Sequence, residues 1–201
     1  MMKELVKEED VVITISNKGF IKRIPVNSYK SQGRGGKGIT AASTGSADDD
    51  FNEHMFIGST HQYIMFFTDK GKCYWLKVYD IPEGTRTSRG KSILTLIEKG
   101  KDESISSFVM VKDFTEELFV TMVTRMGVIK KTKLDSYSNI RKSGINAITL
   151  NGDDALVDVK LTNGQQEIVI GSNSGQAIRF NESQVRDMGR TAAGVRAIRL
   201  G

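Results

Sequence analysis

The fold is decided by the stretch ITISNKGFIKRI, Ile13 to Ile24, in which two short β-type runs flank a polar turn that ends in Gly19. β-Branched and aromatic runs on either side of a turn glycine are typical of a β-hairpin, because glycine readily adopts the positive φ of a tight turn. The pattern returns as MFFTDKGKCYWL (65–76), VTMVTRMGVIKKT (120–132) and VIGSNSGQAIRF (169–180). Four related hairpins in one chain indicate an internal repeat.

The spacing of the glycines supports this repeat. The turn glycines lie 48 to 56 residues apart and are Gly19, Gly71, Gly127 and Gly175. A second set, each member 17 or 19 residues after a turn glycine, is Gly38, Gly90, Gly144 and Gly194. Repeats of this length with about four strands each are typical of propeller blades, which bury their faces only against neighbouring blades. We therefore predict an all-β, propeller-like fold, with a set of unrelated hairpins as the alternative.

The repeat also predicts how the chain is divided. We expect residues 1–8 to form an N-terminal extension and residues 9–201 to form four repeats, at approximately 9–58, 59–112, 113–164 and 165–201. The fourth repeat stops before its last strands, so we expect an incomplete ring and a chain that is part of a longer protein. A strand is also expected over SILTLI, residues 92–97.

Composition narrows the class of protein. The chain has 201 residues, a formal net charge of +5 and a single cysteine, Cys73. It contains neither an apolar run of the roughly 20 residues that span a bilayer nor the apolar segment of a signal peptide. One cysteine cannot form an internal disulfide, which fits a reducing compartment. We expect a cytoplasmic protein without membrane association, and the modest positive charge favours an anionic partner.

The positions of the lysines and arginines along the sequence indicate more about a binding partner than the net charge does. Six of them and no acid occur between Lys18 and Lys37. Cationic loops then recur at one position of each repeat, and their members are Arg34 and Lys37, then Arg86, Arg89 and Lys91, then Arg141 and Lys142, and finally Arg186 and Arg190. If the repeats radiate from an axis, these loops share a rim, and a curved stripe of cations suits a bent DNA duplex contacted through its phosphates.

The sequence contains near-matches to motifs for cofactor binding and catalysis, but each lacks the spacing or the context that the motif requires. Gly33, Gly35 and Gly38 have dinucleotide-fingerprint spacing, but no helical pattern follows them to direct its N-terminus at a pyrophosphate. Five residues separate Gly84 from Gly90, where a phosphate-binding P-loop has four. The two histidines and Cys73 have no metal-like or nucleophile-like partners in sequence. We expect no catalytic residue, metal or cofactor in this chain.

The stretch QGRGGKG, Gln32 to Gly38, resembles the GyrA box, Gln-Arg-Arg-Gly-Gly-Lys-Gly, which characterises the C-terminal domain of the DNA gyrase A protein. Gly33 stands where the box has its first arginine, and the other six positions match. The segments EEDVVITISNKGFIKRIPVNSY (8–29), EHMFIGSTHQYIMFFTDKGKCYWLKVYDIPE (53–83) and TRTSRGKSI (85–93) resemble the same domain. The resemblance covers essentially the whole chain.

The resemblance implies a β-pinwheel, a propeller-like disc whose blades exchange strands. It implies that double-stranded DNA wraps around the basic edge with positive handedness, which lets the ATP-dependent type IIA topoisomerase introduce negative supercoils. The implied partners are the N-terminal part of the same A protein and the gyrase B protein, and ATP and magnesium are used on those other domains of a cytoplasmic, nucleoid-associated bacterial enzyme. The alternatives are the corresponding domain of topoisomerase IV and a propeller-like scaffold that docks proteins.

The expected DNA-binding residues follow from the box and from the cationic loops and strands. They are Gln32, Arg34, Gly35, Gly36, Lys37 and Gly38 of the box, together with Lys22, Arg23, Arg86, Arg89, Lys91, Lys130, Lys131, Arg141, Lys142, Arg179 and Arg190.

Overall fold

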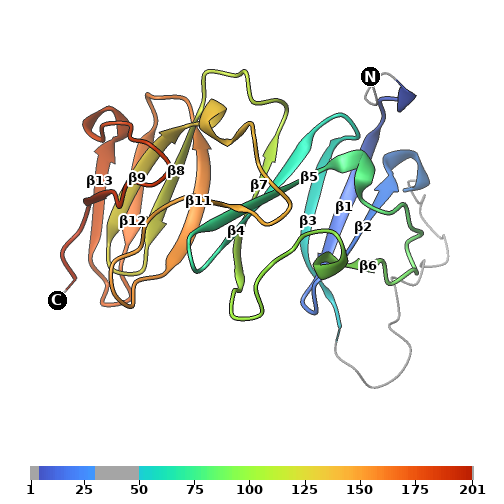
Figure 1. Cartoon of the computed structure of the whole chain (residues 1–201), viewed down its shortest axis with the longest axis horizontal. Coiled ribbons are helices and arrows are strands. Elements are labelled where there is room, and N and C mark those ends of the chain that lie inside the picture. Colours follow the sequence, from blue (N-terminus) through green and yellow to red (C-terminus); the bar gives the residue numbers. More distant parts are fainter. Residues whose placement is uncertain (1–4, 30–49, 201) are drawn as a thin grey trace, which may run out of the picture. The chain divides into compact units, whose positions relative to one another are not determined.

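The computed structural model describes residues 5–29 and 50–200 and has only strands and short 3₁₀ turns as regular structure in those ranges. The all-β prediction is confirmed (Figure 1). All four turn glycines have positive φ, at 80°, 78°, 78° and 86° for Gly19, Gly71, Gly127 and Gly175, as the hairpin pattern predicted. No helix in the described ranges is long and apolar enough to cross a membrane.

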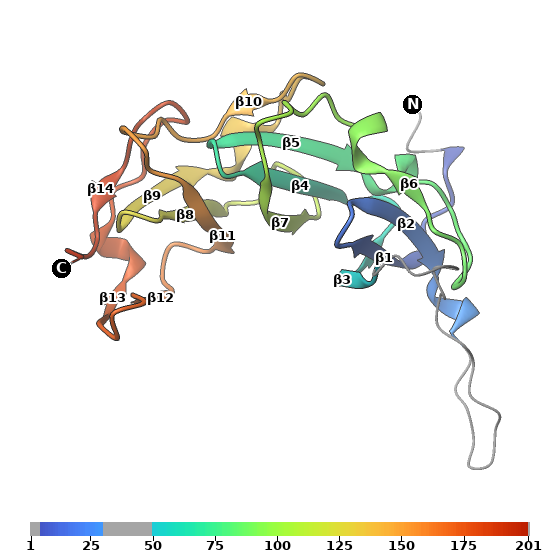
Figure 2. The ribbon, with the colours of Figure 1, turned by 90° about the horizontal axis from the view of Figure 1, so that it is seen from below.

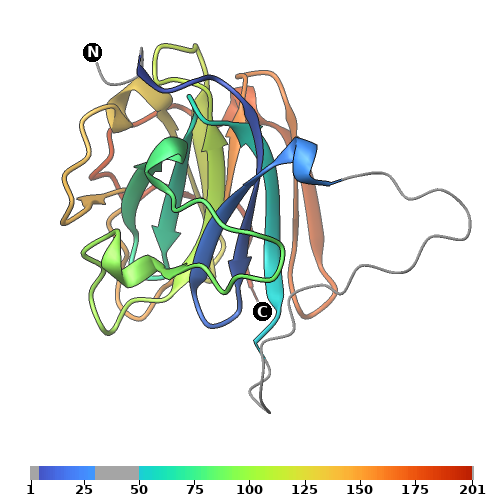
Figure 3. The same ribbon diagram turned by 90° about the vertical axis from the view of Figure 1, so that its right-hand side faces the viewer.

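The first sheet contains a strand from a distant part of the chain. Its spatial order is β3 (Asn52–Ser59), β1 (Asp10–Ser16), β2 (Phe20–Pro25) and β6 (Lys91–Ser92). The hairpin of β1 and β2 pairs Ile15 with Ile21, and β2 then pairs Ile21 with Lys91 of β6. Figure 3 shows the β1–β2 hairpin, with the 3₁₀ turn η2 (Val26–Ser28) following β2.

Two further four-stranded sheets have the same plan. The second has the order β10 (Ile145–Asn146), β5 (Lys72–Lys77), β4 (Tyr63–Thr68) and β7 (Ile105–Val111). The third has the order β11 (Leu156–Thr162), β8 (Phe119–Thr124), β9 (Val128–Lys133) and β14 (Val195–Arg196). In Figure 2, β10 lies beside β5 as β6 lies beside β2. A separate hairpin joins β12 (Glu167–Gly171) to β13 (Ala177–Asn181).

Short 3₁₀ turns follow the second strand of each hairpin. Besides η2 they are η3 (Val78–Asp80), η5 (Leu134–Tyr137) and η6 (Glu182–Gln184). A further turn, η4 (Ile93–Thr95), occupies the segment for which a strand over residues 92–97 was expected. That expectation is wrong beyond Ser92, because Ile93 N–H bonds the Gly19 carbonyl at 2.9 Å and the chain then closes a turn from Leu96 N–H to the Ile93 carbonyl.

The chain forms two compact units. Unit 1 comprises residues 1–64 and 76–98, and unit 2 comprises residues 65–75 and 99–201, so the division passes through β4 and β5. In unit 1 the core is built on β1, whose residues from Val11 to Ser16 are all buried. In unit 2 the fully buried side chains include Phe66, Phe67, Met122 and Tyr137. Burial of each such side chain is worth about 1.5–3 kcal/mol, which favours strands whose two faces are both covered.

Candidate nucleic-acid interface

Each cationic loop in the described ranges leads into a two-residue strand. This strand pairs with the hairpin of the previous repeat. The residue after the loop glycine pairs with the residue two places after the turn glycine, giving the pairs Lys91 with Ile21, Ile145 with Cys73 and Val195 with Ile129. The turn-glycine carbonyl then accepts a hydrogen bond from Ile93, Ala147 or Ala197, at 2.9, 2.8 and 2.9 Å respectively. Three loops are therefore attached to three sheets in one register.

The loop glycines make this attachment sterically possible. Gly90, Gly144 and Gly194 have φ values of 86°, 75° and 88°, in the left-handed region that L side chains rarely adopt. The same physical requirement therefore explains the second set of glycines in all three loops. The backbone turns sharply at the point where each loop joins the neighbouring hairpin.

The loop before Gly90 presents stacked arginines. The Arg86 guanidinium lies 4.2 Å from the centre of the Tyr29 ring, and that of Arg89 lies 3.9 Å from the centre of the Phe20 ring. Arg89 Nε is also 4.0 Å from Asp50 Oδ2, while the Arg89 side chain keeps 56% of its surface exposed. Lys91 follows on β6 and is exposed. Stacking fixes the direction of a cation without neutralising it, so these side chains remain able to bind an anion.

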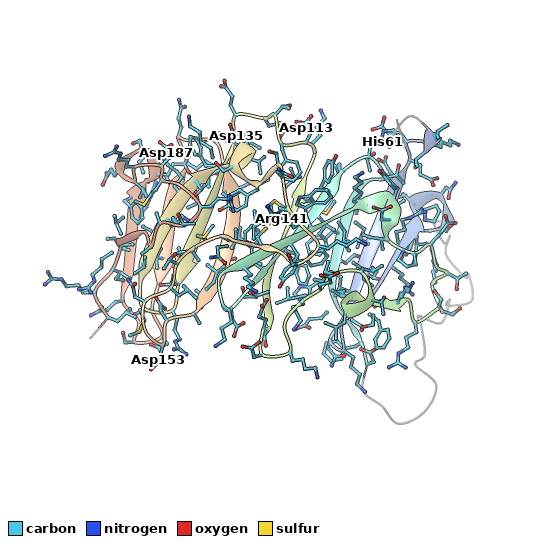
Figure 4. The ribbon with its side chains drawn as sticks, viewed as in Figure 1. His61, Asp113, Asp135, Arg141, Asp153 and Asp187 are labelled. Carbon is cyan, nitrogen blue, oxygen red and sulfur yellow. The ribbon has the colours of Figure 1, made fainter. Side chains whose placement is uncertain are left out.

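The loop before Gly144 carries Arg141 and Lys142, both exposed. Figure 4 shows Arg141 on the segment that runs between η5 and β10. The loop before Gly194 contains the exposed Arg186 and the half-buried Arg190, whose Nη1 donates to the Asn146 carbonyl at 3.4 Å. Arg196 on β14 is exposed too, and sequence reasoning left it out although it stands in the GVRAIRL run that repeats the pattern after each loop glycine.

Two expected cations on the hairpin strands are paired with acids. Arg23 donates from Nε to the Ile81 carbonyl at 2.8 Å and lies 3.3 Å from Glu83 Oε2 through Nη1, with only 15% of its side chain exposed. Arg179 on β13 pairs with Glu167 at 3.1 Å but keeps 72% of its side chain exposed. Hydrogen bonds from Asn181 and from Arg179 lower the pKa of Glu167. These two arginines are less available to an anion than the loop cations.

Three of the expected cations are buried. Lys22, Lys130 and Lys131 have 3%, 0% and 5% of their surface exposed, and their Nζ atoms donate to main-chain carbonyl oxygens. Burial lowers the pKa of Lys22, and burial followed by the charge of Arg190 lowers the pKa of Lys130 to about 8. Their ammonium groups face the protein interior, so these three lysines are not proposed as DNA contacts. The sequence does not distinguish them from exposed lysines, because alternating strands carry both.

An acidic edge of unit 2 contrasts with the cationic loops. A hollow of about 540 Å³ there is lined by Glu116, Glu117, Asp135 and Lys133 among others. Figure 4 shows Asp113 and Asp135 on the upper edge of this unit, with Asp153 at the lower one. Carboxylates repel phosphates, so this edge is a poor surface for a nucleic-acid backbone.

The other positions considered in the sequence are the box residues and the candidates for metal binding or nucleophilic catalysis. The box residues Gln32, Arg34, Gly35, Gly36, Lys37 and Gly38 lie outside the described residues. Within the described ranges, no group of three or more His, Cys, Asp or Glu is arranged to hold a metal ion. Cys73 is buried, and burial raises the pKa of its thiol, which opposes a nucleophilic role. The His61 ring contacts the backbone, with Nε2 2.7 Å from the Val6 carbonyl oxygen.

Sheets of four antiparallel strands, each completed by a strand from the following loop, define the class of propeller-like β-pinwheel domains. The family model described as "DNA gyrase C-terminal domain, beta-propeller" matches residues 10–57, 62–112, 119–163 and 166–201. The chain belongs to the DNA gyrase C-terminal domain family.

Curated relatives agree with this family. The chain is 49% identical to the DNA gyrase A protein of Clostridium acetobutylicum and 46% identical to that of Halalkalibacterium halodurans, in each case over 97% of this chain and 23% of the relative. The chain therefore spans about a quarter of the length of these proteins.

Solved structures agree as well. The C-terminal domain of a DNA topoisomerase IV matches with a TM-score of 0.78 and 33% identity, over 98% of this chain and 59% of that one. A DNA gyrase A C-terminal domain matches with a TM-score of 0.71 and 29% identity, over 96% of this chain and 61% of that one. The predicted pinwheel fold is thereby confirmed.

Proposed function

We propose that this chain binds, bends and wraps double-stranded DNA as the C-terminal part of a gyrase A protein. The observation that carries the proposal is the set of cations on the loops before Gly90, Gly144 and Gly194, together with Lys91 directly after Gly90, because these loops are attached to their sheets in one register. The exposed members are Arg86 (partly), Arg89, Lys91, Arg141, Lys142 and Arg186. Side-chain cations of this kind bind phosphates without selecting a base sequence.

Several loops are needed because bending DNA is costly. Curving 20 to 30 base pairs through 40 to 90° costs about 1–6 kcal/mol, which one loop of two or three cations does not offset. A recurring loop supplies phosphate contacts at intervals along the duplex. The box residues Arg34 and Lys37, whose glycine neighbours allow close approach of the backbone to a phosphate, are proposed as a further contact of the same kind.

In the whole protein we propose that this wrapping gives an ATP-dependent type IIA topoisomerase its ability to introduce negative supercoils. The chain supplies neither the DNA-cleaving group nor the ATP site in this proposal. Those belong to the N-terminal part of the gyrase A protein and to the gyrase B protein, which are the proposed protein partners, with ATP and magnesium as their cofactors. The proposed location is the bacterial nucleoid in the cytoplasm.

A titration of the chain with duplex DNA at several salt concentrations tests the binding step. Each phosphate neutralised contributes about 0.9 to the slope of log K against log salt, so a multi-loop interface gives a slope of several units. Single-stranded DNA of equal length should bind less tightly, because the exposed loops offer few aromatic rings for stacking bases. A slope near zero would favour the alternative that the chain is a scaffold that docks proteins. Tighter binding to any of a panel of acidic proteins than to duplex DNA would favour it as well.

A further inference from the structure

Two lysines at equivalent positions of the repeat are buried in the protein. Lys22 and Lys130 each stand three residues after a turn glycine, and 3% and 0% of their surface is exposed. Lysine is almost never fully buried unless its charge is compensated. Among the described residues, the hydrogen-bond partners of both ammonium groups are main-chain carbonyl oxygens.

Lys22 contacts the cationic loop before Gly90 at three points. Its Nζ donates to the carbonyl oxygens of Thr85, Arg86 and Ser88, at 2.9, 3.1 and 2.6 Å. An ammonium group has three N–H donors, so this set uses all of them. The loop is closed further by Ser88, whose N–H and hydroxyl bond to Thr85. The lysine therefore holds the backbone of the residues that carry the exposed arginines, from the side opposite to solvent.

Lys130 makes the corresponding contact in unit 2. Its Nζ donates to the Ala147 carbonyl at 2.6 Å and to the carbonyl of Arg190 in the last cationic loop. The two sites agree in detail, because a Cβ on Gly90 would meet Lys22 Cβ at 3.2 Å and one on Gly194 would meet Lys130 Cβ at 3.1 Å. The same lysine stem thus lies against the same loop glycine in both units.

The intervening repeat supplies a natural comparison. Tyr74 occupies the equivalent position after Gly71, and its hydroxyl is 3.1 Å from Glu103 Oε2. Its ring lies beneath the loop glycine, since a Cβ on Gly144 would be 2.7 Å from Tyr74 Cε1. An aromatic ring supports the turn but offers no ammonium group to the loop carbonyls. The loop with Arg141 and Lys142 is consequently held by packing at this point.

We propose that Lys22 and Lys130 are positioning residues that hold the cationic loops of the DNA-binding surface from within, and that neither lysine contacts DNA. The effect of these lysines on DNA binding rests on the proposed function. Their hydrogen bonds to the loop carbonyls are present in the chain without DNA. Loss of the ammonium group of Lys22 would remove its hydrogen bonds to the carbonyl oxygens of Arg86 and Ser88, so this part of the loop would turn toward water and its arginines would lose their fixed places.

Lysine labelling of the unmodified chain tests the proposal first. Amine acetylation read by mass spectrometry should leave Lys22 and Lys130 protected in the free protein and should modify Lys91 and Lys142. Added duplex DNA should then protect Lys91 and Lys142. Reaction of Lys22 or Lys130 in the free protein, followed by protection on adding DNA, would overturn the proposal. The labelling of the free protein can be interpreted even if the chain does not bind DNA. Failure of the positioning role is therefore distinguishable from failure of the proposed function.

A double-mutant cycle tests the action through the loop. Lys22→Met should weaken duplex binding by about tenfold in the unmodified chain and by less than about twofold when Arg86→Ala and Arg89→Ala are already present, because residues acting as a unit are not additive. Hydrogen exchange of the amides at residues 84–90 should quicken in Lys22→Met without DNA. Additive effects on binding, with unchanged exchange in the loop, would contradict the proposal.

Lys22→Arg provides the conservative variant. Arginine keeps the charge and contacts phosphates at least as well as lysine, but its planar fork does not match three carbonyls that converge on one ammonium. A positioning role predicts weaker binding in Lys22→Arg, whereas a direct phosphate contact predicts retained binding. If Lys22→Met does not fold, as judged by circular dichroism, Lys130→Met paired with Arg190→Ala provides the same cycle in unit 2.

Discussion

A Cβ atom on Gly194 would lie 2.6 Å from the carbonyl oxygen of Ile129, closer than real Cβ contacts come. The same distance, 2.6 Å, separates a Cβ on Gly90 from the Ile21 carbonyl. Both glycines have positive φ, so glycine is required at the point where each cationic loop joins the neighbouring hairpin. This close approach therefore explains why glycine recurs at these two positions of the repeat.

Gly194→Ala should destabilise unit 2 by about 2–4 kcal/mol, because a non-glycine residue at positive φ costs about 1–3 kcal/mol and the carbonyl of Ile129 must also move. The measurement is urea denaturation followed by circular dichroism. Gly189→Ala is the matched control in the same loop, since nothing lies within 4 Å of its Cβ position and its φ is not positive. Equal stability of the two variants would contradict the close approach.

Glu182→Leu should stabilise the protein by about 1–2 kcal/mol, because a buried carboxylate without hydrogen bonds is costly. Glu182 is fully buried, and among the described residues its two carboxylate oxygens have no hydrogen-bond partner. The equivalent positions of the second and third repeats, seven residues after the turn glycine, hold the buried Val78 and Leu134. Thermal unfolding checks the change, and Ser183→Ala, at an exposed neighbour, is the control. A clear loss of stability would mean that the carboxylate pairs with a cation.

The lowered pKa of Lys130 predicts a pH effect on stability. The Lys130 pKa is about 8 in the folded chain against 10.5 for a free lysine, so between these values the unfolded chain binds more protons. Stability contributed by Lys130 therefore rises with pH from about 8 to 10.5 and is constant below that window. Burial raises the pKa of Tyr74 to about 12, with the hydrogen bond to Glu103 adding to it, and this acts in the opposite direction above its unfolded pKa of 10.0.

Comparison with Lys130→Met separates the effect of Lys130 from that of Tyr74. The free energy of unfolding of the unmodified chain, minus that of Lys130→Met, should increase as the pH is raised from about 8 to about 10. Parallel stability profiles of the two proteins over that range would show that Lys130 has an ordinary pKa in the folded chain.

Arg141→Ala combined with Lys142→Ala should lower the salt slope of duplex binding by about 0.9 for each phosphate contact that is lost, and should weaken binding at every DNA sequence alike. The control is Lys160→Ala, which removes another exposed cation, on β11, where its Nζ is 3.8 Å from Asp158. Loss of affinity in the control to the same extent would indicate that net charge alone governs binding.

Much of the fold was predictable, and particular residues explain why the rest was not. The glycines at 19, 71, 127 and 175 predicted the hairpins because a tight turn needs positive φ. The pairing of Lys91 with Ile21 was not predictable from spacing, since periodicity does not say which hairpin a two-residue strand joins. The resemblance alone implied strand exchange.

The DNA-binding role of the expected residues stays a prediction, and only their positions in the fold can be compared with the sequence. Arg86, Arg89, Arg141 and Lys142 lie on the loops where the sequence placed them. Lys22 and Lys130 were expected among the DNA contacts as cations on the strands after the turn glycines, where period-2 alternation turns only some of the side chains outward. On β2 and β9 residues of both faces are buried, so alternation along these two strands does not separate exposed from buried lysines. The four predicted repeat boundaries remain a prediction.

The central claim, that the chain wraps DNA with a defined handedness, is tested most directly by ligating nicked circular DNA with the chain bound and measuring the linking number after the protein is removed. We predict trapped positive writhe that grows with protein concentration and is lost in Arg34→Ala combined with Lys37→Ala, while linear duplex is still bound. An unchanged linking number at saturating protein would contradict wrapping and leave only DNA binding.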